Sequence, residues 1–242
     1  MEQSSSDFRT AAVFGASGGI GRALSAALVG RGVVVWAGSR SGEKPVGGTR
    51  PFRFDLNDED SIRQAAGLMR DDPPDLVIVA TGVLTLADGT GPERSFKAID
   101  GAAMTRVFAA NTIGPALIAK HLLPILPRER RCVFAVLSAR VGSIGDNRLG
   151  GWHSYRASKA ALNMLVRNFA IELARTHKQG VVAALHPGTV DTSLSEPFQG
   201  NVPDRQLTEP SQAADNLLSV IDGLTPEDSG SHFDWKGETI PA

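Results

Sequence analysis

The chain has 242 residues, of which 42% are hydrophobic and 21% charged, and its formal net charge is −1 at pH 7. This length allows one large α/β domain or two small ones, and the apolar fraction is sufficient for a sizeable core. The near-neutral charge excludes a general attraction to nucleic acid or to anionic membranes, so neither is expected as a partner.

Cys132 is the only cysteine, so an intramolecular disulfide cannot form. A single thiol inside an apolar run fits the reducing cytoplasm better than an oxidising compartment. Residues 1–9 are polar and Ser-rich and lack the apolar core of a signal peptide. We therefore expect a soluble cytoplasmic protein with a flexible tail over residues 1–9 and a single domain over residues 10–242. No stretch approaches the roughly 18 apolar residues of a membrane span.

Short apolar runs alternate with longer helical patterns along the chain. The runs are almost continuously hydrophobic, as in parallel strands that are covered on both faces. They predict strands over residues 10–14, 33–38, 50–54, 76–80, 132–137 and 181–186. Apolar residues at helical spacing predict helices over residues 20–31, 58–70, 100–123 and 155–175. Parallel neighbours need helical crossovers, so we expect one Rossmann-type α/β fold, a doubly wound parallel sheet of six strands.

Three long irregular segments follow strands four, five and six of this predicted sheet, over residues 82–96, 139–154 and 187–209. All three therefore lie at the carboxyl edge of the sheet, where open α/β folds bind their ligands. Loops of this length usually carry function or are disordered.

Residues 15–21, between the first strand and the first helix, read Gly-Ala-Ser-Gly-Gly-Ile-Gly. Glycines let the backbone turn tightly and approach a pyrophosphate, which the free N–H groups of a helix N-terminus attract. A close helix–strand contact alone needs the same residues, but the position favours a nucleotide site. The spacing fits two glycine motifs and does not settle the subclass. We expect cofactor contacts from Gly15, Ser17, Gly19, Ile20 and Gly21.

The end of the second strand indicates which dinucleotide binds. NAD-specific sites usually place an acidic residue there to hold the ribose hydroxyls. This chain has Ser39 and Arg40 instead, so no carboxylate at these positions repels a 2′-phosphate, and the Arg40 guanidinium offers a fork of donors to bind it. The alternative is a solvated loop arginine. The pattern favours NADP(H).

Tyr155 is the only tyrosine, and Lys159 lies four residues later on the same face of a predicted helix. A nearby ammonium stabilises a phenolate and lowers the pKa of the phenol from its ordinary value of about 10. The pair could then exchange a proton with a substrate, although a surface Tyr and Lys on a helix would give the same spacing.

Asn111 and Pro115 lie within one predicted helix, and Pro115 has no N–H to give to the carbonyl of Asn111. An interruption there could hold an ordered water, or be a kink without function.

Together these residues resemble the short-chain dehydrogenase/reductase family, from Gly15 to about residue 236. Tyr155 and Lys159 match its Tyr-x-x-x-Lys signature, and Asn111 matches its helix asparagine. The resemblance implies that Tyr155 is the acid or base, that Lys159 binds the nicotinamide ribose and lowers the tyrosine pKa, and that Asn111 holds a relay water. It also implies cofactor contacts from Asn111, Tyr155 and Lys159 and from Asp55, Leu56, Ala80, Thr81, Gly82, Pro187, Gly188, Val190 and Thr192.

Finer features resemble the C-factor or sniffer-like carbonyl reductases: residues 142–147 (Gly-Ser-Ile-Gly-Asp-Asn), residues 150–152 (Gly-Gly-Trp) and residues 233–237 (Phe-Asp-Trp-Lys-Gly). This resemblance implies a homodimer or homotetramer joined through the two long helices. The chain departs from the family pattern at the serine that orients the substrate carbonyl, because that position is Ala139, preceded by Ser138. The serine role is assigned to Ser138, with Ser143 as a rival.

These patterns predict an NADP(H)-dependent oxidoreductase that interconverts a small carbonyl compound and its alcohol. Its expected catalytic residues are Asn111, Ser138, Tyr155 and Lys159. A non-catalytic NADP-binding regulatory protein is one alternative, which Ala139 favours. An epimerase or dehydratase that uses bound cofactor transiently is the other. No His/Cys cluster has metal-ligand spacing, so no metal is expected.

Overall fold

Seven parallel strands form the main sheet of the computed structural model, which describes residues 7–201 and 207–242. Their order is β3-β2-β1-β4-β5-β6-β9. The strands are β1 (Thr10–Phe14), β2 (Val34–Ser39), β3 (Arg50–Arg53), β4 (Leu76–Val79), β5 (Cys132–Leu137), β6 (Gly180–His186) and β9 (His232–Asp234). The doubly wound sheet is confirmed, and the six predicted strands agree with it to about one residue at each end.

The prediction of six strands is wrong by one, because β9 adds a seventh at the edge of the sheet. Its residues pair in parallel with Ala184, Leu185 and His186 of β6. A segment of three residues is too short to show strand periodicity, so only the pairing with β6 defines it. The strands β7 (Thr189–Val190) and β8 (Leu207–Thr208) form a separate two-stranded sheet.

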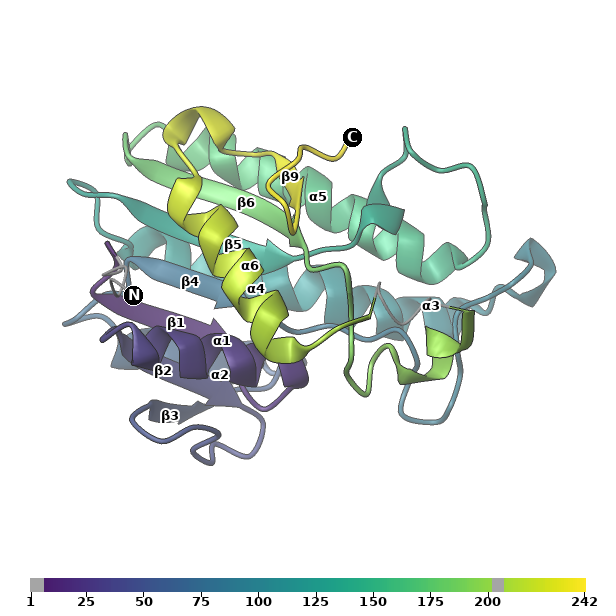
Figure 1. Cartoon of the computed structure of the whole chain (residues 1–242), viewed down its shortest axis with the longest axis horizontal. Helices are drawn as coiled ribbons and strands as arrows, with labels where there is room; N and C mark the ends of the chain where they lie inside the picture. Colours follow the sequence, from purple (N-terminus) through teal and green to yellow (C-terminus); the bar gives the residue numbers. More distant parts are fainter. Residues whose placement is uncertain (1–6, 202–206) are drawn as a thin grey trace.

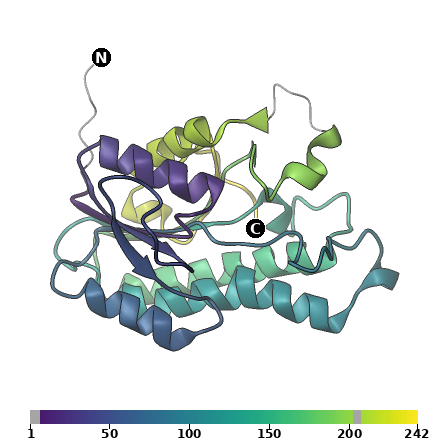
Figure 2. The same ribbon diagram turned by 90° about the horizontal axis from the view of Figure 1, so that it is seen from below.

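Helices cover both faces of the sheet, as Figures 1 and 2 show. One face carries α1 (Gly19–Gly30) and α6 (Pro210–Gly223), and the other carries α2 (Glu59–Leu68), α4 (Gly114–Leu122) and α5 (His153–Leu173). Successive side chains of a strand point to opposite faces, so Ile78 packs toward α1 and α6 while Val77 packs toward α4 and α5. The helix α6 was not predicted from the sequence.

The single helix predicted over residues 100–123 is divided in the structure. It consists of α3 (Gly101–Phe108), a π-helical turn (Ala109–Ile113) and α4. The interruption expected near Asn111 and Pro115 is therefore confirmed as a π turn.

Residues 1–6 of the predicted tail lie outside the described residues. The next residues are anchored: Phe8 is buried in the core, and the Arg9 N–H donates to the Asp75 carboxylate. No helix within residues 7–201 and 207–242 is long and apolar enough to cross a bilayer.

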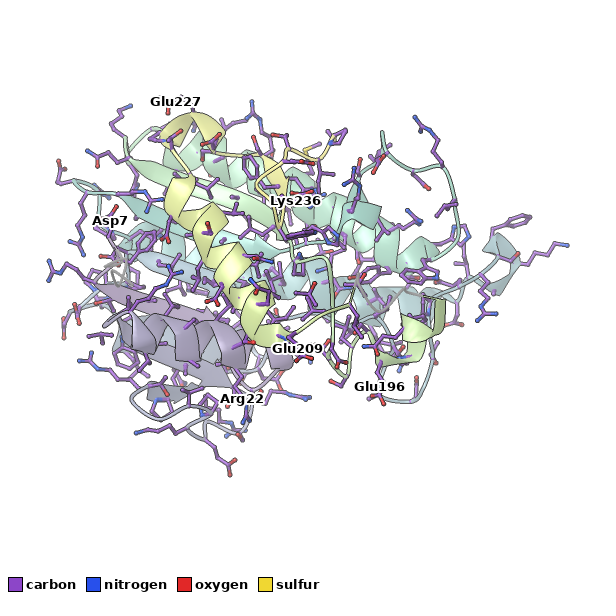
Figure 3. All side chains as sticks on the ribbon, in the orientation of Figure 1. Asp7, Arg22, Glu196, Glu209, Glu227 and Lys236 are labelled. Carbon is purple, nitrogen blue, oxygen red and sulfur yellow. The ribbon has the colours of Figure 1, made fainter. Side chains whose placement is uncertain are left out.

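The strand order reverses between β1 and β4, and the segments after β4, β5 and β6 all leave the same edge of the sheet. In Figure 1 these segments lie on the side toward which the β1, β4 and β5 arrows point. Glu196, within the last segment, lies on that same side of the molecule (Figure 3). The fold thus gathers the predicted site residues at one edge.

Candidate active site

A pocket of about 320 Å³ opens at the carboxyl ends of β1 to β4, where the strand order reverses. Nine of the residues predicted to contact the cofactor line it: Gly15, Ser17, Ser39, Arg40, Asp55, Leu56, Ala80, Thr81 and Gly82. The pocket is also lined by Gly18, Phe54, Asn57, Val83 and Ala110, which the sequence did not single out. The position of Asn57 beside Asp55 could have been found from the sequence. The N–H of a residue two places after an Asp commonly donates to the Asp carboxylate, as the Asn57 N–H does to Asp55.

The glycine turn contributes Gly15, Ser17 and Gly18 to the wall of this pocket and leaves no room for a side chain at positions 15 and 21. Gly15 has a φ of +91°, and a Cβ there would lie 2.9 Å from the Ala80 carbonyl oxygen. A Cβ on Gly21 would lie 2.2 Å from the Gly15 carbonyl oxygen. Gly18 precedes α1 without any side-chain cap, so the first N–H groups of the helix are left to bind an anion. Ile20 packs against the core between α1 and the sheet.

Arg40 is exposed at the mouth of the pocket, directly after β2. It has no hydrogen-bond or ion-pair partner in the described part of the chain. The preceding Ser39 is buried, and its hydroxyl accepts the Gly42 N–H and so fixes the turn that presents Arg40. The arrangement leaves a guanidinium available to a phosphate group.

The segment after β6 runs back toward the glycine turn. Gly188 has a φ of +80°, and a Cβ there would meet the Trp235 ring at 3.1 Å. The Thr192 methyl group would lie 2.6 Å from a Cβ on Gly19, so this segment contacts the start of α1. Pro187 lies at the start of the segment and is partly exposed, whereas Val190 is buried in it.

Asn111 lies on the π turn and is fully buried. Its Oδ1 accepts the Val83 N–H at 2.8 Å, and its Nδ2 donates to the Val83 carbonyl at 2.9 Å and to the Ser158 hydroxyl at 3.2 Å. The Ser158 hydroxyl in turn donates to the Tyr155 carbonyl at 2.8 Å. Asn111 therefore ties the segment after β4 to the helix that carries Tyr155.

Tyr155 and Lys159 lie one turn apart on α5, and both are buried. The Lys159 Nζ lies 5.9 Å from the centroid of the Tyr155 ring and donates to the Leu137 carbonyl at 2.8 Å. A Cβ on Gly82 would lie 3.3 Å from the Asn111 Oδ1 and 3.6 Å from the Lys159 Nζ. Because Gly82 also lines the nucleotide pocket, the fold brings Asn111, Tyr155 and Lys159 together beside it.

Burial changes the proton affinities of this pair in opposite directions. It raises the pKa of Tyr155 to about 12 and lowers the pKa of Lys159 to about 8, because an apolar environment disfavours the charged form of each. The tyrosine pKa thus moves upward in this structure, whereas the ammonium of Lys159 was expected to lower it. Burial is the cause of the upward shift, and the Lys159 ammonium donates to the Leu137 carbonyl.

Neither of the two candidate serines, Ser138 and Ser143, has a hydrogen bond to Tyr155 in the described chain. The Ser138 hydroxyl donates to the Asn163 Oδ1 at 2.7 Å, on the face of the sheet covered by α5. The Ser143 hydroxyl accepts the Asp146 N–H at 3.0 Å and lines a separate pocket whose other residues do not include Tyr155. Ala139 packs against Tyr155 instead. The assignment of the serine role to Ser138 is therefore not supported, because successive residues at the end of β5 face different neighbours.

Glu93 anchors the N-terminus of α5 and was not found from the sequence. Its carboxylate accepts the Ser154 N–H at 3.1 Å and also the Ser154 hydroxyl, and its carbonyl accepts the Trp152 N–H at 2.5 Å. Burial acts to raise the pKa of Glu93, but the hydrogen bonds from Ser154 and the nearby His153 outweigh it and lower the pKa. Trp152 has a φ of +50°, unusual for a side chain of this size, and the contact with Glu93 holds it there.

The chain resembles known proteins over most of its length. The family model of the short chain dehydrogenases matches residues 9–202. The chain is 37% identical to the C-signal of Myxococcus xanthus over 70% of this chain and 93% of that protein. It is 35% identical to 1-hydroxy-2-glutathionyl-2-methyl-3-butene dehydrogenase of Rhodococcus sp. (strain AD45), over 91% of this chain and 94% of that one.

The fold is also similar to solved structures. An NADPH-bound carbonyl reductase from chicken fatty liver superposes with a TM-score of 0.82 at 25% identity, covering 97% of this chain and 99% of that one. A short-chain dehydrogenase/reductase from Burkholderia multivorans with bound NADP superposes with a TM-score of 0.81 at 25% identity, covering 97% of this chain and 100% of that one. The seven-stranded sheet, the family model and the two relatives agree, and the chain belongs to the short chain dehydrogenase family of oxidoreductases.

Proposed function

We propose that the protein is an NADP(H)-dependent carbonyl reductase that interconverts a small carbonyl compound and its alcohol. The observation that carries this proposal is the placement of Tyr155 and Lys159 on one turn of α5, next to the glycine that lines the nucleotide pocket. A buried proton donor and a buried ammonium at the mouth of a dinucleotide pocket are suited to reduction of a carbonyl group.

The residues of the pocket fit a dinucleotide. The glycine turn would hold the pyrophosphate, Asp55 and Leu56 would flank the adenine end, and Lys159 would hold the nicotinamide ribose. Thr81 lines this pocket and its hydroxyl is buried without a partner in the described chain, so it has hydrogen bonds to give to a ligand. When bound, NADPH supplies the hydride.

The side chains of the protein carry out the proton transfer. With its pKa raised to about 12, Tyr155 stays protonated at neutral pH and can donate its proton to the oxygen of a carbonyl as negative charge develops there. Lys159 and Asn111 lie on the route by which the proton is replaced. In the direction of alcohol oxidation, the same groups accept the proton.

The preference for NADP(H) over NAD(H) rests on Arg40. Its guanidinium is exposed beside the pocket without a partner in the described chain, and neither Ser39 nor Arg40 carries a negative charge. The solved neighbours from chicken fatty liver and Burkholderia multivorans are described as NADPH-bound and NADP-bound, which supports the same choice here.

The test is oxidation of NADPH by the purified protein with a panel of aldehydes and ketones, comparing the wild type with Tyr155→Phe. Removal of the proton donor is expected to lower kcat by about 10²- to 10⁴-fold while NADPH still binds. If a carbonyl is reduced and the variant retains full activity, the assignment of Tyr155 is wrong. A Lys159→Met variant should also bind NADPH more weakly, because it lacks the ammonium group that would hold the nicotinamide ribose.

A non-catalytic NADP-binding protein is the second candidate, and Ala139 favours it because the pocket lacks the expected serine. NADPH binding without turnover across the whole panel would support that function. An epimerase or dehydratase would instead change its substrate without net loss of NADPH, which product analysis would detect.

We further propose a homodimer or homotetramer in the cytoplasm. Met164 and Ile171 on α5 and Ile113 at the end of the π turn are large apolar side chains that are about half exposed or more, which supports helix packing against a second copy. The single cysteine is free and buried, which supports a reducing compartment.

A further inference from the structure

The ring of Trp235 packs on the backbone of the segment that follows β6. Trp235 is the first residue after β9, and the five-membered part of its indole lies over Gly188. A Cβ on Gly188 would lie 3.1 Å from the Cδ1, 3.3 Å from the Nε1 and 3.7 Å from the Cγ of this ring. The indole therefore occupies the space that a side chain at position 188 would need.

The turn that carries Trp235 is fixed by its own hydrogen bonds. Asp234 is buried and lies opposite His186 where β9 pairs with β6, the two strands that Figure 1 shows side by side. The Asp234 Oδ1 accepts the Lys236 N–H at 2.9 Å and the Glu238 N–H at 3.0 Å. The Asp234 N–H donates to the Glu238 carbonyl at 2.9 Å. The indole thus extends from a rigid turn at the edge of the sheet.

The segment beneath the ring is flexible at Gly188 and held at its far end. Gly188 has a φ of +80°, and glycine has the widest choice of backbone conformations of any residue. Four residues later, the Thr192 methyl group would lie 2.6 Å from a Cβ on Gly19, so that end contacts the start of α1. The three atoms nearest to the Cβ position of Gly188 all belong to Trp235. The ring therefore restricts the backbone where the segment is most free to move.

The position of this segment matters because it is expected to flank the nicotinamide. Hydride transfer needs the reacting atoms about 3–3.5 Å apart, and a displacement of about 1 Å can lower the rate roughly 10²-fold. A segment that moves at Gly188 would hold the nicotinamide in the reactive position for a smaller fraction of the time, and a lower population of the competent state weakens binding in proportion.

On the proposed function, we infer that Trp235 is a positioning residue for the nicotinamide half of NADPH. It acts through Gly188 and does not itself take part in the proton or hydride transfer. The adenine half is proposed to bind near Arg40 and Asp55, in the nucleotide pocket, and Trp235 does not line that pocket. Loss of the indole should therefore affect one half of the cofactor and not the other.

The test measures Kd by calorimetry for NADPH and for adenosine 2′,5′-bisphosphate, which has the adenine and the 2′-phosphate but no nicotinamide. Trp235 is 38% exposed, so its removal in Trp235→Ala opens no closed cavity in the core. If the segment is then competent about a tenth of the time, Kd for NADPH rises about tenfold, while Kd for the bisphosphate stays unchanged.

Two further variants control for the chemistry of the side chain. Trp235→Phe keeps an aromatic ring over Gly188 and should bind NADPH more tightly than Trp235→Ala does. Lys236→Met keeps the indole and removes the ammonium, which lies 5.1 Å from the centroid of the indole, and it should leave both Kd values unchanged.

The activity of Trp235→Ala separates weak binding from poor positioning. At saturating NADPH the cofactor site is full, so a decrease in kcat that persists there reports the position of the nicotinamide. We expect kcat for carbonyl reduction to fall by about tenfold to hundredfold under these conditions.

An equal increase in both Kd values in Trp235→Ala, or no increase in either, would overturn the inference. A selective loss of NADPH affinity in Trp235→Ala, with no carbonyl reduced by the wild type, would support the role of Trp235 and contradict the proposed function. Absence of NADPH binding by the wild type would overturn both.

Fluorine NMR covers the case in which Trp235→Ala does not fold. The chain has three tryptophans, so protein labelled with 5-fluorotryptophan gives three fluorine resonances, and Trp235→Phe identifies the one from Trp235. NADPH should shift this resonance in the otherwise unchanged protein, and the bisphosphate should leave it in place. A resonance that responds to neither ligand, or equally to both, would overturn the inference.

Discussion

The Ser138 hydroxyl donates a 2.7 Å hydrogen bond to the Oδ1 of Asn163, and this bond directs it into the space between β5 and α5. Ser138 is buried, and the Nδ2 of Asn163 lies 3.4 Å from the Nδ1 of His232 on β9. A polar chain thus links the ends of β5 and β9 through α5. In this arrangement the hydroxyl at position 138 takes part in a structural hydrogen bond on the face of the sheet that α5 covers.

The Ser138→Ala variant separates the two roles. Removing the donor leaves the half-buried Asn163 oxygen without its partner, so the free energy of unfolding should fall by about 1 kcal/mol in urea titrations. The value of kcat/KM for the best carbonyl substrate should stay within about threefold of the wild type, since no transition-state contact is lost. A loss as large as that in Tyr155→Phe, with stability retained, would restore Ser138 to the catalytic set.

The Arg40→Ala variant tests the choice of cofactor. A hydrogen bond to a charged group contributes about 1.5–3 kcal/mol, so Kd for NADPH should rise about tenfold to hundredfold. The Kd for NADH should change little, because NADH lacks the 2′-phosphate. Binding is measured by the fluorescence of the bound nicotinamide, with Arg63→Ala on the exposed face of α2 as the matched surface control. An equal increase in Kd for NADPH and for NADH would mean that Arg40 stabilises the pocket and does not bind the 2′-phosphate.

The Glu93→Ala variant tests the anchor at the start of α5. It removes the carboxylate that accepts the Ser154 N–H and hydroxyl, two residues after the strained Trp152. Loss of a helix N-terminal acceptor typically lowers the free energy of unfolding by about 0.5–2 kcal/mol. Because Tyr155 follows Ser154 directly, kcat should fall as well.

A matched Glu93→Gln variant keeps one acceptor oxygen and should show a smaller decrease in both stability and kcat. If Glu93→Ala matches the wild type in thermal unfolding and in kcat, the contact does not position the helix.

The sheet and the glycine turn could be predicted from the sequence because their signals are local. Nearly continuous apolar runs define β1 and β5, and a turn that excludes side chains leaves glycines at positions 15 and 21. An interruption of the helix near Asn111, which the structure shows as a π turn, was also predictable, because Pro115 removes a specific helical hydrogen bond of Asn111.

The remaining features depend on contacts between distant segments. Strand β9 exists through its pairing with β6, and Glu93 reaches α5 across 61 residues of sequence. The orientation of Ser138 depends on which face of the sheet its side chain takes at the end of β5. The sequence pattern of the family does not specify this orientation when the neighbouring residue, here Ala139, differs from the pattern. The upward pKa of Tyr155 depends on the walls built around it by three separate loops.

Two histidines on the neighbouring strands β6 and β9, His186 and His232, predict a dependence of stability on pH. His232 on β9 is buried and His186 on β6 is half-buried, and each has one ring nitrogen buried without a partner in the described chain. The charged groups that act on them are Lys159 on α5, Asp234 on β9 and Arg140 after β5. Burial is the largest influence and lowers the pKa of each histidine to about 4.

Between pH 6.5 and 4, the unfolded chain therefore binds protons that the folded chain does not, and the free energy of unfolding falls as the pH falls. Each histidine should account for about 2 kcal/mol of the decrease between pH 7 and pH 5. In His232→Gln one titrating group is removed, so urea unfolding at the two pH values should show a decrease smaller than that of the wild type by about this amount. His186→Gln should behave alike. The same decrease in the wild type and both variants would mean that these histidines are solvated in the folded protein and that other groups cause the loss of stability in acid.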